Sequence, residues 1–140
     1  MGTGWSVAVA TVFVWLGMVL AISFLEAPLK FRAPGVTPAL GLGIGRLVFR
    51  ALNACEAVLA LAALAGVWWG ARPGATAAVV VATLMLAVQI AVVRPVLTRR
   101  SNEVLAGRDA PRSRAHLGYV ALEVVKVIAL LSAGTLLLVH

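Results

Sequence analysis

The sequence predicts an all-α integral membrane protein, a four-helix bundle of two antiparallel hairpins with both termini outside. The chain of 140 residues is 62% hydrophobic and only 12% charged, which is not the composition of a soluble protein. Four apolar stretches are each long enough to cross a hydrocarbon core of about 30 Å as a helix. Most basic residues lie in two of the three connecting loops. The four stretches cover residues 5–26, 51–70, 75–94 and 115–139.

The basic residues also predict the orientation. The first and third loops hold ten of the twelve Lys and Arg residues, the second loop holds only Arg72, and Lys126 lies within a span. Because cytoplasmic loops carry an excess of Lys and Arg, we expect loops one and three in the cytoplasm and the second loop outside. This pattern explains the net charge of +7 without a nucleic-acid partner. The basic residues of loops one and three are Lys30, Arg32, Arg46, Arg50, Arg94, Arg99, Arg100, Arg108, Arg112 and Arg114.

Proline and capping residues predict the ends of the first two helices. Pro28 cannot donate a backbone hydrogen bond, so it predicts the end of the first helix and an irregular loop over residues 28–37. Thr37 is suited to an N-cap and Pro38 to the first helical position. These two residues predict a second helix that begins before the membrane and runs to Trp69.

The second hairpin is expected to begin at a turn over residues 72–74. The third span is interrupted by Gln89 and reaches Pro95, where we expect a kink before the helix continues to Gly107. Glycine is suited to the position just after a helix end. The sequence has no internal repeat and no low-complexity linker, so it predicts one domain over residues 1–140.

The fourth apolar stretch carries a polar face. Four polar residues are spaced by three, four and three positions, so they lie within an arc of about 80° on a helix. The opposite face is apolar and suited to lipid. Because charged groups deep in hydrocarbon are costly, we expect these side chains to point into the protein. The four residues are His116, Tyr119, Glu123 and Lys126.

A second polar stripe descends along the second helix, again at helical spacing. Counting residues from the cytoplasmic edge brings Glu56 of this stripe and Glu123 to one depth. Glu26 and Gln89 bring polar groups of the other two spans to the same layer, so a common interior site is predicted. The stripe consists of Arg46, Arg50, Asn53 and Glu56.

The charges at this layer predict a binding site. Glu56 and Glu123 against Lys126 leave one carboxylate over, and a buried carboxylate without a partner takes a proton. Its partner is Arg50, a proton or a bound cation. We expect a polar pocket, open toward the cytoplasm, for something polar or cationic; alternatively, these groups only hold the helices together. The predicted binding layer is Glu56, Glu123, Lys126, Asn53, Gln89, Tyr119 and His116, with Glu26, Arg46 and Arg50 as gating or charge partners.

The sequence indicates no metal site and no catalytic group. His116 and Glu123 are about 10 Å apart along a helix axis, too far to ligate one ion together. The motifs of di-iron, zinc-protease, c-type haem and hydrolase sites are absent from the sequence, and Cys55 is the single cysteine. The glycines within residues 41–45 follow no predicted strand, so we interpret them as sites of close helix packing and not as a nucleotide loop.

One stretch of the chain resembles a known group of proteins. GMVLAISFLEAPLKF, residues 17–31, is similar to small four-helix membrane proteins of unknown function, as are Pro95 and His116 in their places. That group resembles a human transmembrane protein linked to platinum-drug resistance and, distantly, copper-resistance D-type proteins and a haem-dependent membrane protoporphyrinogen oxidase. The resemblance implies the four-helix fold, and only its distant members imply haem or copper. The chain lacks the first-helix His of the oxidase-like relatives and the first-helix Glu of small multidrug transporters, and it carries Glu123 and Lys126 where milder polar residues are expected.

Three functions are compatible with these features. The leading one is a small transporter or binding protein for an ion or polar solute, acting at the layer of Glu56, Glu123 and Lys126. The alternatives are a membrane redox, metal- or haem-handling protein and an accessory subunit whose polar layer docks helices. We favour a role that is not enzymatic. The Arg-rich composition favours a bacterial inner (plasma) membrane, with the lipid bilayer and either a second copy or another membrane protein as partners.

Overall fold

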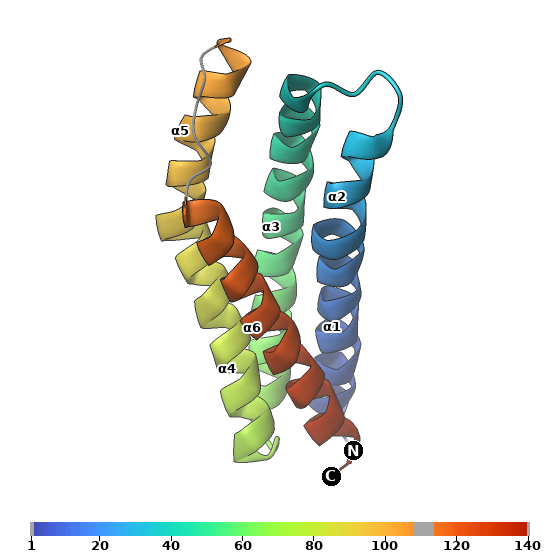
Figure 1. Ribbon diagram of the computed structural model, residues 1–140. Helices are drawn as coiled ribbons and strands as arrows, with labels where there is room; N and C mark the ends of the chain where they lie inside the picture. Colours follow the sequence, from blue (N-terminus) through green and yellow to red (C-terminus); the bar gives the residue numbers. More distant parts are fainter. Residues whose placement is uncertain (1, 108–113, 140) are drawn as a thin grey trace.

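The computed structural model describes residues 2–107 and 114–139 and forms a bundle of four spans. Every regular element in these ranges is a helix, and four helices are long and apolar enough to cross a membrane. The predicted all-α four-helix membrane bundle is therefore confirmed. Figure 1 shows the two termini together at one end and the connection between α2 (Ala27–Leu29) and α3 (Pro38–Trp68) at the other. The spans cover Thr3–Arg32, Pro38–Trp68, Pro73–Leu105 and His116–Leu138.

The first span is one continuous helical rod with a wide turn in it. It comprises α1 (Thr3–Val19), the π-helical segment η1 (Leu20–Glu26), α2 (Ala27–Leu29) and the short 3-10 segment η2 (Lys30–Arg32). The prediction that Pro28 ends this helix is wrong. A proline ring clashes with the carbonyl four residues earlier, here that of Phe24, and η1 widens the helix around it. The irregular connection is thus confined to residues 33–37.

The third span contains a second wide turn in the same relation to a proline. It comprises α4 (Pro73–Val88), the π-helical segment η3 (Gln89–Val93) and α5 (Arg94–Leu105). As before Pro28, the π segment ends two residues before Pro95. The predicted continuation of this helix toward Gly107 is confirmed, and Gly107 stops it with a φ of 81°. Arg108 and Arg112 of the predicted loop lie outside the described residues.

The second span, α3 (Pro38–Trp68), begins as predicted. The hydroxyl of Thr37 accepts a hydrogen bond from the backbone N–H of Leu40 at 3.1 Å, which caps the helix. Its 31 residues extend about 46 Å, more than a bilayer core of about 30 Å. The predicted turn over residues 72–74 is wrong, because Pro73 is already the first residue of α4 and the turn uses Gly70 at a φ of 98°.

The four spans form a closed ring. In it α3 packs between α1 and α4, and α6 (Arg114–Leu138) packs between α4 and α1. Figure 1 shows α6 crossing the bundle obliquely, with its first turns near α5 and its last turns near α1. The indole N–H of Trp5 donates to the carbonyl of Leu137 at 3.0 Å and joins the two ends of the chain there.

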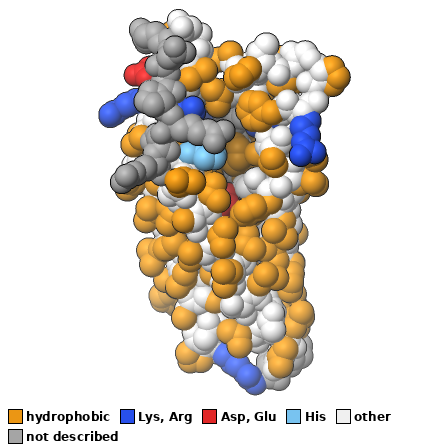
Figure 2. Space-filling model, viewed as in Figure 1, with side chains coloured by type: hydrophobic (Ala, Val, Ile, Leu, Met, Phe, Trp, Pro, Cys, Tyr) orange, Lys and Arg blue, Asp and Glu red, His pale blue; other side chains and the backbone are white. Residues whose placement is uncertain are grey.

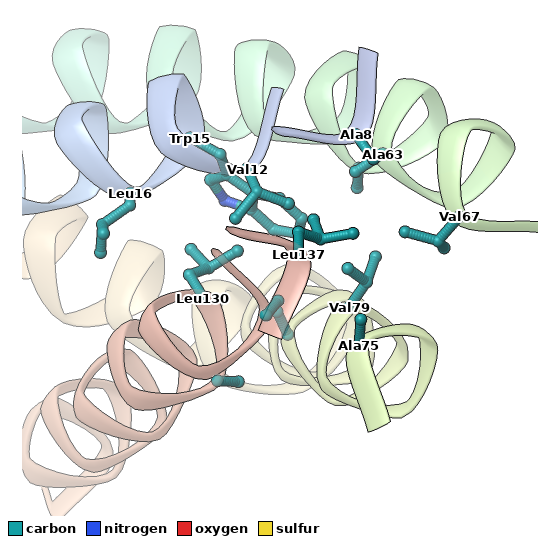
Figure 3. Packing of buried hydrophobic residues seen from close by; sticks show 14 of the residues in the cluster. Ala8, Val12, Trp15, Leu16, Ala63, Val67, Ala75, Val79, Leu130 and Leu137 are labelled. Carbon is teal, nitrogen blue, oxygen red and sulfur yellow. The ribbon is translucent and has the colours of Figure 1, made fainter. Parts of the chain in front are cut away.

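An apolar core fills the half of the bundle nearer the termini. Figure 3 shows side chains of all four spans meeting in it, including Trp15 of α1, Val67 of α3, Val79 of α4 and Leu130 of α6. Several of the remaining members are alanines, and small residues let membrane helices approach closely. The buried polar residues of the described chain lie beyond this core, toward the basic end.

The outer surface is apolar around its middle. Figure 2 shows hydrophobic side chains over the length of the visible face, with Lys and Arg side chains gathered at its two ends. Leu47 and Leu61 are each 69% exposed, as are many other large apolar side chains. Exposure on this scale is expected where lipid covers the surface, so the chain is a multi-pass integral membrane protein.

The sidedness is testable by thiol labelling. In a Cys55→Ala background, a single cysteine at position 33 is expected to be shielded from a membrane-impermeant reagent in intact cells, because basic loops stay in the cytoplasm. Cysteines at positions 3 and 139 are expected to react. The cysteine-free chain is the control, and a position-139 cysteine that reacts only after lysis would reverse the orientation.

Candidate functional site

The centre of the site is a lysine that is completely enclosed. Lys126 of α6 is 0% exposed. Its ammonium lies 2.6 Å from Oε1 of Glu56 on α3 and 2.5 Å from Oε1 of Glu123, one turn earlier on α6. It also donates to Oε1 of Gln89 in η3 at 2.8 Å. A lysine ammonium has three N–H donors, so three acceptors satisfy the charged form completely.

Glu123 is supplied with donors at both carboxylate oxygens. Besides Lys126, its Oε1 accepts from the amide Nε2 of Gln89 at 3.3 Å. Its Oε2 accepts from the hydroxyl of Ser23 in η1 at 2.6 Å. The same Gln89 amide reaches the carbonyl of Tyr119 at 3.4 Å and so holds η3 against α6. These donors stabilise Glu123 as the ionised carboxylate.

Glu56 is supplied at one oxygen only. Its Oε1 accepts from Lys126 and from the indole N–H of Trp15 at 2.9 Å. Its Oε2 is buried, and no group in the described part of the chain hydrogen-bonds to it. The side-chain oxygens of Asn53 and Tyr119 are likewise buried and unpaired among the described residues. The site therefore combines a saturated ion pair with unsatisfied oxygens.

Both π-helical segments supply a side chain to this cluster. Ser23 lies in η1 and Gln89 in η3, and each bonds to Glu123. π-Turns occur frequently at functional sites. Here Pro28 and Pro95 account for them physically, since each clashes with a carbonyl inside the segment that precedes it.

The predicted approach of Glu56 to the polar face of the fourth span is confirmed. The structure brings Glu56, Gln89, Glu123 and Lys126 into direct contact, from three different spans. Trp15 and Ser23 of the first span bond to Glu56 and Glu123, so all four spans contribute side chains. We call these six residues the cluster: Trp15, Ser23, Glu56, Gln89, Glu123 and Lys126. Asn53 and Tyr119 are also buried, at 8% and 7% exposure.

Four predicted site residues lie outside the buried cluster: His116 of the predicted binding layer, and the three predicted gating or charge partners Glu26, Arg46 and Arg50. His116 and Arg50 have exposed side chains and Arg46 is half-buried, so none of the three belongs to the buried cluster. Glu26 pairs with Lys30 at 3.9 Å, one turn along the same helix. The first span reaches Glu123 through Ser23 instead. The wide turn of η1 changes the rotation of the helix, so α-helical spacing does not give the direction of Glu26.

Sequence reasoning missed Trp15 and Ser23. A buried tryptophan usually finds a partner for its N–H, and Trp15 lies inside the first apolar stretch, so its indole was a usable signal. Ser23 carried no comparable signal, because a serine in a membrane helix commonly bonds to its own backbone. Its link to Glu123 depends on how α1 and α6 pack.

An aromatic layer lies between the cluster and the basic end. The rings of Phe49 and Tyr119 meet edge to face, with centroids 5.9 Å apart. The guanidinium of Arg94 and the ammonium of Lys30 lie 5.6 Å and 5.8 Å from the Phe49 centroid. Phe49 is two turns before Glu56 on α3, about 10 Å along the axis. Phe49 therefore lies on α3 between Glu56 and the basic end of the bundle.

Two hollows in the described structure lie away from the cluster. One of about 270 Å³ is at the end with the termini, lined by residues that include Trp5, Gly66 and Trp69. The other, about 550 Å³ and apolar, lies between the start of α3 and Leu105 at the end of α5. Neither is lined by the cluster, so a pocket opening from the cluster stays a prediction.

Neither a search for metal-binding groups nor a comparison with known proteins adds a functional assignment. Among the described residues, no group of three or more His, Cys, Asp and Glu side chains is placed to hold a metal ion. Comparison of the chain with protein families, with curated proteins and with solved structures found no match.

Proposed function

We propose that this membrane protein binds an ion or polar solute at the cluster around Lys126 and carries it across the bilayer. The observation behind the proposal is an ammonium, 0% exposed, bridging two buried carboxylates inside a four-span bundle. Ionisable residues within membrane spans are costly and mark substrate or ion pathways by default. Here the groups do not balance, because two carboxylates face one ammonium.

The unpaired oxygens add support. A cluster that served only to hold helices together is expected to satisfy all its polar atoms, as a buried unpaired oxygen is costly in an apolar interior. Glu56 Oε2 remains unpaired among the described residues, and so does Oδ1 of Asn53 one turn away. These oxygens are acceptors for a positively charged or hydrogen-bond-donating ligand.

A second candidate function has one observation in its favour. Three of the four carboxylate oxygens and all three donors of Lys126 are paired. That degree of pairing also suits an accessory subunit in which the cluster docks the helices of one protein. Stable co-purification of a single membrane partner, with no response to solutes, would favour this candidate.

The test is electrical recording from proteoliposomes on a solid support. Rapid exchange to Na⁺, K⁺, choline or lower pH is expected to give a current with the wild type for at least one of these probes. The double variant Lys126→Met/Glu123→Gln removes one charge of each sign, so it keeps the net charge and is expected to fold while losing the current. A double variant with wild-type currents, or a wild type silent to every probe, would overturn the proposal.

A further inference from the structure

The charge of the cluster can be counted from its hydrogen bonds. Lys126 is ringed by three acceptors and is therefore the charged ammonium. Two ionised carboxylates beside it would leave one negative charge in an apolar interior. An uncompensated buried charge is so costly that the group neutralises instead. We therefore expect one of the two carboxyls to bind a proton or a cation. The hydrogen bonds indicate which carboxyl it is.

The donors around the two carboxyls are unequal. Glu123 receives Lys126 and Gln89 on one oxygen and Ser23 on the other, so both of its oxygens already accept hydrogen bonds. Glu56 receives its two donors on Oε1, and Oε2 is free of partners within the described residues. A proton added to Oε2 of Glu56 would displace no existing hydrogen bond.

We propose that Glu56 binds an exchangeable proton at Oε2, so that the cluster at rest is Lys126 ammonium, Glu123 carboxylate and Glu56 carboxylic acid. This inference deepens the proposed function and rests on it, because it names the proton as the ion that the cluster takes. No bond other than O–H forms. The proton comes from water and returns to water when Glu56 ionises.

The neighbouring residue on α3 supplies an acceptor for that proton. Asn53 precedes Glu56 by three residues, so the two side chains share one helix face about 5–6 Å apart at their Cβ atoms. Its Oδ1 and Glu56 Oε2 are both acceptors without partners among the described groups. Two acceptors cannot bond to one another unless a proton lies between them, and a protonated Glu56 supplies it.

The groups that face Glu56 come from every packed span. α6 presents Lys126, Glu123 and the hydroxyl of Tyr119, while α1 presents Trp15. Arg94 of α5, at the aromatic layer, also interacts electrostatically with Glu56. Trp15 does not titrate, so the charges that act on Glu56 are Lys126 and Glu123 within the cluster and Arg94 at the aromatic layer.

Infrared spectroscopy of the full chain in lipid measures this state directly. A protonated carboxyl gives a C=O stretch that an ionised one lacks. At neutral pH we expect one such band in the wild type, shifted down in D₂O because the proton exchanges. Glu56→Gln and Glu123→Gln are each expected to show none, since one carboxylate then balances Lys126. Lys126→Met is expected to show two.

A second pair of variants assigns the band to Glu56. Trp15→Phe removes the donor to Glu56 Oε1 and is expected to raise the stretching frequency. Ser23→Ala removes the donor to Glu123 Oε2 and is expected to leave the band in place. A band that moves with Ser23→Ala and not with Trp15→Phe would assign the proton to Glu123 and overturn the inference. So would a wild type with no band, which would indicate a bound cation or an unbalanced charge.

Failure of the inference and failure of the proposed function give different results. Proton entry into vesicles holding a pH-sensitive dye, driven by a K⁺ diffusion potential, is measured on the same preparation. The expected band with neither proton entry nor a current for any of the other probes would keep the protonated Glu56 and remove the transport function. Cation currents without the band would keep the function and remove the proton as its ion.

Discussion

Lys126→Met is expected to lower the free energy of unfolding by about 3 kcal/mol, the lower end for breaking a buried ion pair. The substitution removes three hydrogen bonds at once, because Gln89 and both carboxyls lose the one that the ammonium donates. The loss stays at the lower end because both carboxyls can take up protons. Denaturation in mixed detergent, followed by circular dichroism, measures it.

A double variant and a control at a lipid-facing position test whether the loss of stability comes from the buried ion pair. Adding Glu123→Gln to Lys126→Met is expected to recover most of the loss, since one carboxyl no longer needs a proton. Val125→Met, at a side chain 42% exposed on the same helix, is expected to leave stability unchanged. If Lys126→Met is as stable as Val125→Met, the buried ammonium contributes nothing and the description of the cluster is wrong.

Gly66→Ala is expected to destabilise the bundle by about 1–3 kcal/mol, as overpacking does. A Cβ at Gly66 would lie 2.7 Å from the carbonyl oxygen of Gly4 and 2.9 Å from the backbone nitrogen of Ala8. Both are backbone atoms of α1, so the helix itself must move. Since Trp15 of α1 donates to Glu56 of α3, this shift also loosens the site. Thermal unfolding in detergent measures the effect.

Gly43→Ala is the matched control on the same helix. A Cβ at Gly43 meets nothing within 4 Å, so alanine there is expected to be neutral or to stabilise by about 0.5–1 kcal/mol through helix propensity. Equal losses at Gly66 and Gly43 would show that the close approach of α1 and α3 does not limit stability. This control also refines the interpretation of residues 41–45, where Gly41 and Gly45 lie against Phe31 and Lys30 and Gly43 does not.

The sequence alone determined the number of spans and much of their course. Four apolar stretches of bilayer length fix four helices, because a backbone in lipid must satisfy its own hydrogen bonds. Thr37 and Pro38 located the start of α3, and Gly107 the end of α5. Helical spacing also put Glu123 and Lys126 on one face, and depth counting brought Glu56 to their level. Each of these follows from local geometry or from length.

Only the tertiary structure decided which groups meet across the helices. The directions of Ser23 and Gln89 depend on two π-turns, and the sequence shows only the prolines that cause them. Glu26 was expected in the cluster on depth alone, yet the rotation after η1 leaves it beside Lys30. Glu56 Oε2 has no partner among the described residues, and this is likewise a result of packing, since it depends on where Trp15 and Lys126 approach. The depth of a residue in the membrane follows from its position along one helix. Contact between two side chains also depends on the rotation and tilt of both helices, which are set by packing.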